Sequence, residues 1–237
     1  MRRRGIPNVD LAAYARAVPL LLRHPSIFAM PLLAAVVDLL LQQVAPILTD
    51  PTGGMGNFLF AIVTQLVYGF CFGVAVIAAN NVWRRGRTTF DEAWEEGRSK
   101  AGGILIATIG FYFLLYVAQY AGQLLGSPIV QIVLQLIVAF FLIYTIPAAA
   151  IGGMPGNFAI GASIRAVRAN VLGAAILAII FVVLWVWLPD FVVNRFALGF
   201  GVIGFELVRA AIKAIVLAYL AFPFAKQYDD VAFRGYW

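Results

Sequence analysis

Long apolar stretches separated by short polar connections dominate this chain of 237 residues. An α-helix rises about 1.5 Å per residue, so roughly 20 apolar residues are needed to cross about 30 Å of hydrocarbon. Six segments are long enough, and they lie at about residues 27–48, 58–80, 103–123, 128–151, 171–188 and 203–224. Because the connections are too short to fold alone, the pattern predicts an all-α bundle of six transmembrane helices, with residues 1–237 forming a single membrane domain.

The amino-acid composition excludes a soluble protein. The chain is 63% hydrophobic and 12% charged, whereas soluble domains are about half apolar and a quarter charged. A net charge of +6 would suggest nucleic-acid binding in a soluble protein, since basic patches neutralise phosphates. Here the cations follow the connections between spans, so we expect no nucleic-acid partner.

The connections alternate between basic and nearly uncharged. One side collects Arg2, Arg3, Arg4, Arg16, Arg23, Arg84, Arg85, Arg87, Arg98, Lys100, Arg165, Arg168, Lys226 and Arg234. Arg195 falls on the other side, while Arg209 and Lys213 lie within the last span. The positive-inside rule therefore predicts that both termini are cytoplasmic. Trp185 and Trp187, near the outer end of span five, fit an interfacial aromatic belt.

Short amphipathic segments precede spans one, three and five on the cytoplasmic side. In "TTFDEAWEE", Thr89 and Glu92 form a capping-box pattern, and Phe90 and Trp94 share a face four residues apart. The segments "DLAAYARAVPLLL" and "FAIGASIRAVRA" show similar spacing. The pattern predicts a unit of surface helix, span, outer loop and span that occurs three times at roughly 70 to 80 residues. Alternatively, basic loops that flank spans produce such helices without any repeat.

Four charged residues interrupt the spans: Asp38, Glu206, Arg209 and Lys213. Each costs roughly 2.5–3.5 kcal/mol on insertion scales, so such residues usually face a partner or water. Asp38 and Lys213 both lie about 16 Å from the cytoplasmic ends of their spans. We hypothesise that Asp38 pairs with Lys213 or Arg209, and that Glu206 holds Arg209. Alternatively, span six begins at Glu206, and the two cations reach toward the outer surface.

Glutamines form a second polar feature. Four of the glutamines in the spans lie about 22–24 Å from the cytoplasmic end, and they are Gln42, Gln65, Gln119 and Gln135. Span three adds a stripe at helical spacing, made of Thr108, Tyr112, Tyr116, Gln119 and Gln123. We expect these groups to face inward around a wet cavity, because polar stripes that face lipid are costly. The layer is either a binding or transport path, or a set of interhelical hydrogen bonds worth about 0.6 kcal/mol each. Pro31 and Pro147 should interrupt spans one and four.

The groups that catalytic and cofactor sites need are missing from the sequence. His24 is the one histidine and Cys71 the one cysteine, so paired haem ligands and typical zinc sites have no donors. No helix carries a paired-carboxylate or H-E-x-x-H pattern, and no serine has a histidine close by in sequence. We therefore expect a non-enzymatic protein without a cofactor or a metal.

Four segments carry a family resemblance: "LLRHPSIFAMPLL", "FDEAWEEGRSKAGGIL", "GASIRAVRANVLGAAIL" and "QYDD". In this order the chain resembles the bacterial six-helix integral membrane proteins related to the membrane domain of glycerophosphoryl diester phosphodiesterases. The resemblance implies the same fold and a bacterial cytoplasmic membrane. It transfers no site residues, and the chain has no catalytic phosphodiesterase domain.

Two functions remain open at this point. The first is an accessory or scaffold subunit of a larger membrane assembly, which binds membrane lipids and other membrane-protein subunits. The second is a small transporter or channel whose polar path uses the charged residues and the glutamine layer.

Overall fold

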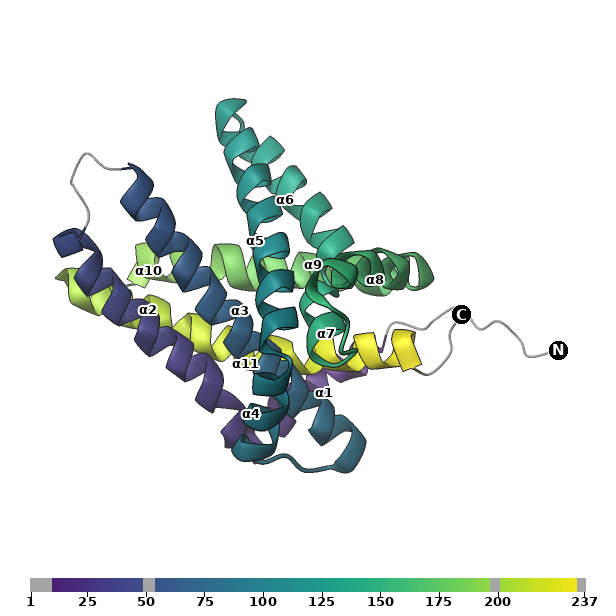
Figure 1. Ribbon diagram of the computed structural model, residues 1–237. Coiled ribbons are helices and arrows are strands. Elements are labelled where there is room, and N and C mark those ends of the chain that lie inside the picture. Colours follow the sequence, from purple (N-terminus) through teal and green to yellow (C-terminus); the bar gives the residue numbers. More distant parts are fainter. Residues whose placement is uncertain (1–9, 49–53, 197–200, 234–237) are drawn as a thin grey trace.

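The protein is an all-helical bundle in a computed structural model that describes residues 10–48, 54–196 and 201–233 (Figure 1). Within these ranges there are no strands, and six helices are long and apolar enough to cross a membrane. The predicted fold class, a multi-pass helical membrane bundle, is confirmed.

The described residues form eleven α-helices and two irregular turns, and three of these helices lie outside the six spans. Their bounds are α1 Leu11–Arg23, the 3₁₀ turn η1 Pro25–Phe28, α2 Ala29–Leu48, α3 Gly54–Arg85, α4 Phe90–Ser99, α5 Ala101–Leu124, α6 Pro128–Leu142, α7 Thr145–Ala150, α8 Gly156–Ala169, α9 Val171–Phe181, the π-helical turn η2 Val182–Trp187, α10 Leu188–Phe196 and α11 Gly201–Phe233. Spans one to three are α2, α3 and α5. Span four is α6 with α7, span five runs from α9 to α10, and span six is α11.

Spans two, five and six are longer than the hydrophobic pattern predicts. The segment "LPDFVVNRF", predicted as an outer connection, is helical from Leu188 to Phe196 and continues α9 through the π-helical turn. Pro189 lacks a backbone N–H, and its ring crowds the carbonyl four residues earlier. The wider turn just before it lets the helix continue past the proline. At the other end, α11 extends to Phe233, because its last turns pack inside the protein.

Span four is interrupted between Leu142 and Thr145. Pro147 cannot donate a hydrogen bond to the carbonyl of Ile143, so the regular helix ends there. The Ser163 hydroxyl on α8 donates to the carbonyl of Phe141 at 2.9 Å and accepts from the N–H of Tyr144 at 3.1 Å. A side chain from another helix thus satisfies the broken backbone.

Pro31, by contrast, lies in the first turn of α2. A proline there removes little, because the first N–H groups of a helix have no partner within it. The expected interruption of span one is therefore absent from α2.

The three predicted surface helices are α1, α4 and α8, and each leads almost directly into an odd-numbered span. Asp10 accepts from the N–H of Ala13 at the start of α1. Thr89 accepts from the N–H of Glu92 at 3.2 Å, as the capping pattern predicted. Short joints at His24, Lys100 and Asn170 end the three surface helices before the spans begin.

The three units pack as a closed ring. The second span of each unit lies against the first span of the next: α3 against α5, α6 against α9, and α11 against α2. Each surface helix packs on the unit before it, with α4 on α3, α8 on α6 and α7, and α1 on α11. Figure 1 shows the hairpins α2–α3 and α5–α6 diverging from a common base. The base, which we call the basic end, carries α1, α4 and α8 with Arg16, Arg23, Arg84, Arg85, Arg87, Arg98, Lys100, Arg165, Arg168 and Lys226.

Candidate functional site

Asp38 is the centre of a buried polar cluster between α2, α3 and α11. Its side chain is 4% exposed. One carboxylate oxygen, Oδ2, accepts from the Tyr68 hydroxyl at 2.8 Å and lies 3.5 Å from Lys213 Nζ. The other, Oδ1, accepts from the amide of Gln42 at 2.9 Å. Three donors from three helices therefore replace the water that a carboxylate loses in hydrocarbon.

Lys213 is also surrounded by aromatic rings. Its Nζ lies 5.2 Å from the centre of the Tyr68 ring and 5.8 Å from that of Trp185. The two rings meet edge to face at 5.1 Å. Ring faces attract a cation, and desolvation strengthens that attraction. Trp185 is buried and thus serves the cluster, so its predicted place in an interfacial belt is wrong.

Arg209 forms a second ion cluster four residues earlier on the same helix. Its Nη1 contacts both oxygens of Glu206, at 3.0 and 3.3 Å. Its Nη2 lies 3.2 Å from an oxygen of Asp190 on α10. The sequence interpretation missed Asp190 because it was placed in a connection rather than in span five. The signal that could have identified Asp190 was an acidic side chain near the outer end of the helix face that carries the cations of span six.

Small residues allow the two helices of the cluster to approach closely. Ala210 and Ala214 on α11 pack against Ala35 on α2 in a separate buried group. Residues four apart share one helix face, and small side chains there let backbones come together in membranes. This close approach brings Asp38 and Lys213 within reach of one another.

The structure does not join the four predicted glutamines. Gln42 belongs to the Asp38 cluster, whereas Gln65 lies on α3 and its Oε1 is buried without a hydrogen-bond partner. Gln135 is buried on α6 with its Oε1 also unpartnered, and Gln119 is half-buried on α5. Within the described residues no hydrogen bond links any two of them. The four glutamines were predicted to lie at a common depth in the membrane, but they do not form one connected layer.

Comparisons with family models, curated proteins and solved structures find no match. The likeness to the phosphodiesterase-associated membrane family therefore stays a prediction, and the site must be interpreted from its own geometry.

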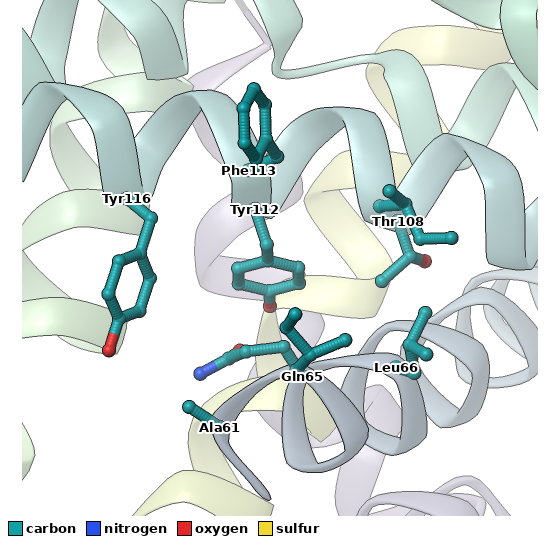
Figure 2. Close-up of a pocket in the computed structure, with 9 residues that line it drawn as sticks. Ala61, Gln65, Leu66, Thr108, Tyr112, Phe113 and Tyr116 are labelled. Carbon is teal, nitrogen blue, oxygen red and sulfur yellow. The ribbon is translucent and has the colours of Figure 1, made fainter. Parts of the chain in front are cut away.

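A pocket of about 80 Å³ lies between α3 and α5, and we call it the α3–α5 pocket (Figure 2). It is lined by Ala61, Ile62, Gln65, Leu66, Thr108, Ile109, Tyr112, Phe113 and Tyr116. A single water needs about 10–15 Å³ measured in this way, so the pocket holds a small group. The predicted stripe of span three does reach it through Thr108, Tyr112 and Tyr116. Its walls are mainly apolar, unlike the expected wet cavity.

Aromatic rings close the centre of the bundle between the Asp38 cluster and the basic end. Phe224 contacts Phe72 at 5.1 Å and Phe181 at 6.0 Å, and Phe181 contacts Phe111 at 5.5 Å between ring centres. The small space among these rings leaves no room for a water molecule. We call these four residues the phenylalanine plug. No water-filled path passes through it in this conformation.

A second polar network lies beyond the plug, at the basic end. The amide of Gln227 donates to the Tyr14 hydroxyl at 2.6 Å, and the Tyr144 hydroxyl donates to Gln227 Oε1 at 2.9 Å. The network connects α1 to α11 and to the interruption of span four. Burial raises the pKa of the Tyr14 hydroxyl well above its ordinary value, so this group stays neutral at physiological pH.

Arginine and lysine complete this end of the bundle. Arg84 at the end of α3 donates through Nε to Asp229 at 2.8 Å, and Lys226 pairs with Asp230 one turn along α11. These contacts use the "QYDD" segment that the family resemblance singled out. They tie the last turns of α11 to α3.

Proposed function

We propose that the protein is a non-enzymatic membrane subunit that holds together a larger assembly in a bacterial cytoplasmic membrane. The basic end faces the cytoplasm in this proposal, as the positive-inside rule requires. Lipids and other membrane-protein subunits are its partners, and neither nucleic acid nor a cofactor takes part.

The closed interior is the observation that favours a scaffold. The described charges within the spans have counter-charges in the protein, and the phenylalanine plug leaves no space for water. The outer faces, in contrast, carry large exposed apolar side chains on every span, such as Leu124 and Ile129 at 71% and 73% exposure. A protein whose centre is closed by aromatic rings and whose outside is apolar acts through the surfaces it offers to lipid and to other helices.

Native mass spectrometry of complexes released directly from membranes tests the scaffold proposal. We expect the chain in a stoichiometric complex with at least one other membrane protein. Three bulky substitutions, Leu40→Trp on α2, Ile137→Trp on α6 and Ile215→Trp on α11, alter different exposed faces. The substitution on the partner-covered face should release the partner, and the other two are matched controls. A chain that leaves the membrane alone, carrying only lipid, would contradict the proposal.

A transporter is the second candidate, and the Lys213–Asp38 distance favours it. At 3.5 Å this pair is longer than the about 2.7–2.9 Å of a tight charged hydrogen bond. A loosely held pair in the membrane interior can exchange partners during transport. Under this proposal Asp38→Asn or Lys213→Met abolishes an uptake or efflux phenotype while the protein still folds. Retained activity in either folded variant rules the transport path out.

A further inference from the structure

The α3–α5 pocket opens sideways, toward the surface that faces hydrocarbon. Four of its lining side chains are also exposed on the outside of the bundle: Ile62 by 37%, Ile109 by 51%, Phe113 by 59% and Tyr116 by 46%. The residues that line the pocket belong to α3 and α5, which are parts of two hairpins that diverge from the base (Figure 1). A molecule dissolved in the bilayer can therefore enter it without crossing water.

The inner wall of the pocket presents an unused hydrogen-bond acceptor. Gln65 Oε1 is buried and has no partner, and a buried polar group without a partner is costly. Figure 2 shows the Tyr112 ring reaching from α5 toward the Gln65 amide. The Tyr112 hydroxyl likewise makes no hydrogen bond to any described residue. Thr108 has no proton to donate to a ligand, because its hydroxyl donates to the carbonyl of Ile104 at 2.8 Å.

The chemistry of the lining selects the ligand. No charged side chain lines the pocket, so a phosphate, a carboxylate or an ammonium group would be buried without a counter-charge. A plain hydrocarbon would leave the Gln65 acceptor unsatisfied. A hydroxyl both donates and accepts, and it matches the Gln65 carbonyl and the Tyr112 hydroxyl together.

We propose that the α3–α5 pocket binds an apolar lipid alcohol, such as an isoprenoid or sterol-like alcohol, that enters from the bilayer. Its hydroxyl donates to Gln65 Oε1 and accepts from the Tyr112 hydroxyl. Its apolar body lies along Leu66, Ile62 and Ile109. This binding site does not depend on whether the protein is a scaffold or a transporter.

Photolabelling of the full chain in phosphatidylcholine vesicles tests this site. The probe is an isoprenoid alcohol that carries a diazirine on its chain, and the control probe is its methyl ether, which cannot donate a hydrogen bond. We expect the alcohol to label the α3 and α5 segments that line the pocket. The ether should label them about three- to tenfold less, as the loss of one hydrogen bond predicts. Equal labelling by both probes, or labelling spread evenly over the exposed faces of all six spans, overturns the proposal.

Substitutions test separately the hydrogen bond to Gln65 and the free volume of the pocket. Gln65→Leu should lower labelling by the alcohol to the level of the ether, whereas Gln119→Leu, on α5 outside the pocket, should leave it unchanged. Ala61→Phe fills the pocket and should abolish pocket labelling by both probes. Tyr112→Phe keeps the ring and removes the hydroxyl, so it provides a second test should Gln65→Leu fail to fold. Labelling by the alcohol that stays at its original level in a folded Gln65→Leu variant, or pocket labelling that persists in a folded Ala61→Phe variant, overturns the site.

Discussion

Lys213 illustrates how a single charge remains stable within hydrocarbon. Insertion of one charge costs roughly 2.5–3.5 kcal/mol. A hydrogen bond to a charged group returns about 1.5–3 kcal/mol, and a desolvated cation–π contact returns about 2 kcal/mol. Asp38 accepts from Tyr68 and Gln42, while Lys213 has a carboxylate and two rings. Contacts of this size offset the cost of burying both charges, so the pair belongs to the core.

The Asp38–Lys213 pair should therefore behave as a coupled unit. Removing one partner leaves a buried charge uncompensated, which costs about 3 kcal/mol. We expect Asp38→Asn and Lys213→Met each to lower the free energy of unfolding by about this amount. The double variant should recover at least half of the summed loss, because no charge is left unpaired.

Denaturant unfolding in mixed micelles measures this cycle. Arg98→Gln is the matched control, since Arg98 and Glu95 form an exposed pair on α4 and such pairs contribute under about 1 kcal/mol. Strictly additive losses for Asp38→Asn and Lys213→Met would show that the two charges do not stabilise each other.

At the scale of the helices, the sequence predicts where helices occur better than it predicts their irregularities. Runs of apolar residues and the Thr89 cap were enough to locate the six spans and the three surface helices. Pro147 predicted the interruption of span four, whereas the π-helical turn before Pro189 was not predicted. The partner of the broken backbone in span four could not be predicted either, because a helix breaks cheaply only where another element satisfies its backbone, and that element is distant in sequence. Ser163 does so for span four, and its own segment carries no signal for that role.

Ser163→Ala should accordingly destabilise the interruption of span four. The substitution leaves the Phe141 carbonyl and the Tyr144 N–H without their partner. The expected loss is about 1–3 kcal/mol in the free energy of unfolding, together with faster amide exchange across residues 141–148. Ser99→Ala, whose hydroxyl is exposed at the end of α4, should change neither value. Unchanged exchange at Tyr144 in Ser163→Ala would mean that the hydroxyl does not hold the break.

The contact between α3 and α5 depends on a glycine. A Cβ at Gly69 would overlap the side chain of Thr108, whereas a Cβ at Gly102 would meet nothing within 4 Å. Gly69→Ala should lower the free energy of unfolding by about 1–3 kcal/mol through overpacking. Gly102→Ala should give a small gain, because alanine favours helix. Thr108→Ala in the Gly69→Ala background should restore part of the loss, and equal effects at the two glycines would argue against close packing here.

At the scale of the whole molecule, three similar units close a ring in which each unit supplies a surface helix to its neighbour. The sequence predicted the unit but left open whether it was only a consequence of basic loops. The cyclic order, with α3 on α5, α6 on α9 and α11 on α2, favours a true repeat over that alternative. The glutamines could not be assigned from depth alone, because tilt and rotation decide which neighbour a side chain meets. The partners in the Asp38 cluster were easier to predict, because a charged side chain has few acceptable partners in hydrocarbon.

The ring also requires that every surface helix lies on one side of the membrane, which the positive-inside rule assigns to the cytoplasm. Cysteines tested in a Cys71→Ala background locate the two sides. Arg87→Cys, in the exposed connection before α4, should react with an impermeant maleimide only after the membrane is opened. Leu125→Cys, 67% exposed between α5 and α6, should react in intact cells. Reagent access decides the outcome independently of any function. If Arg87→Cys reacts in intact cells and Leu125→Cys does not, the bundle is inverted. If both react from the same side, the six-span crossing itself is wrong.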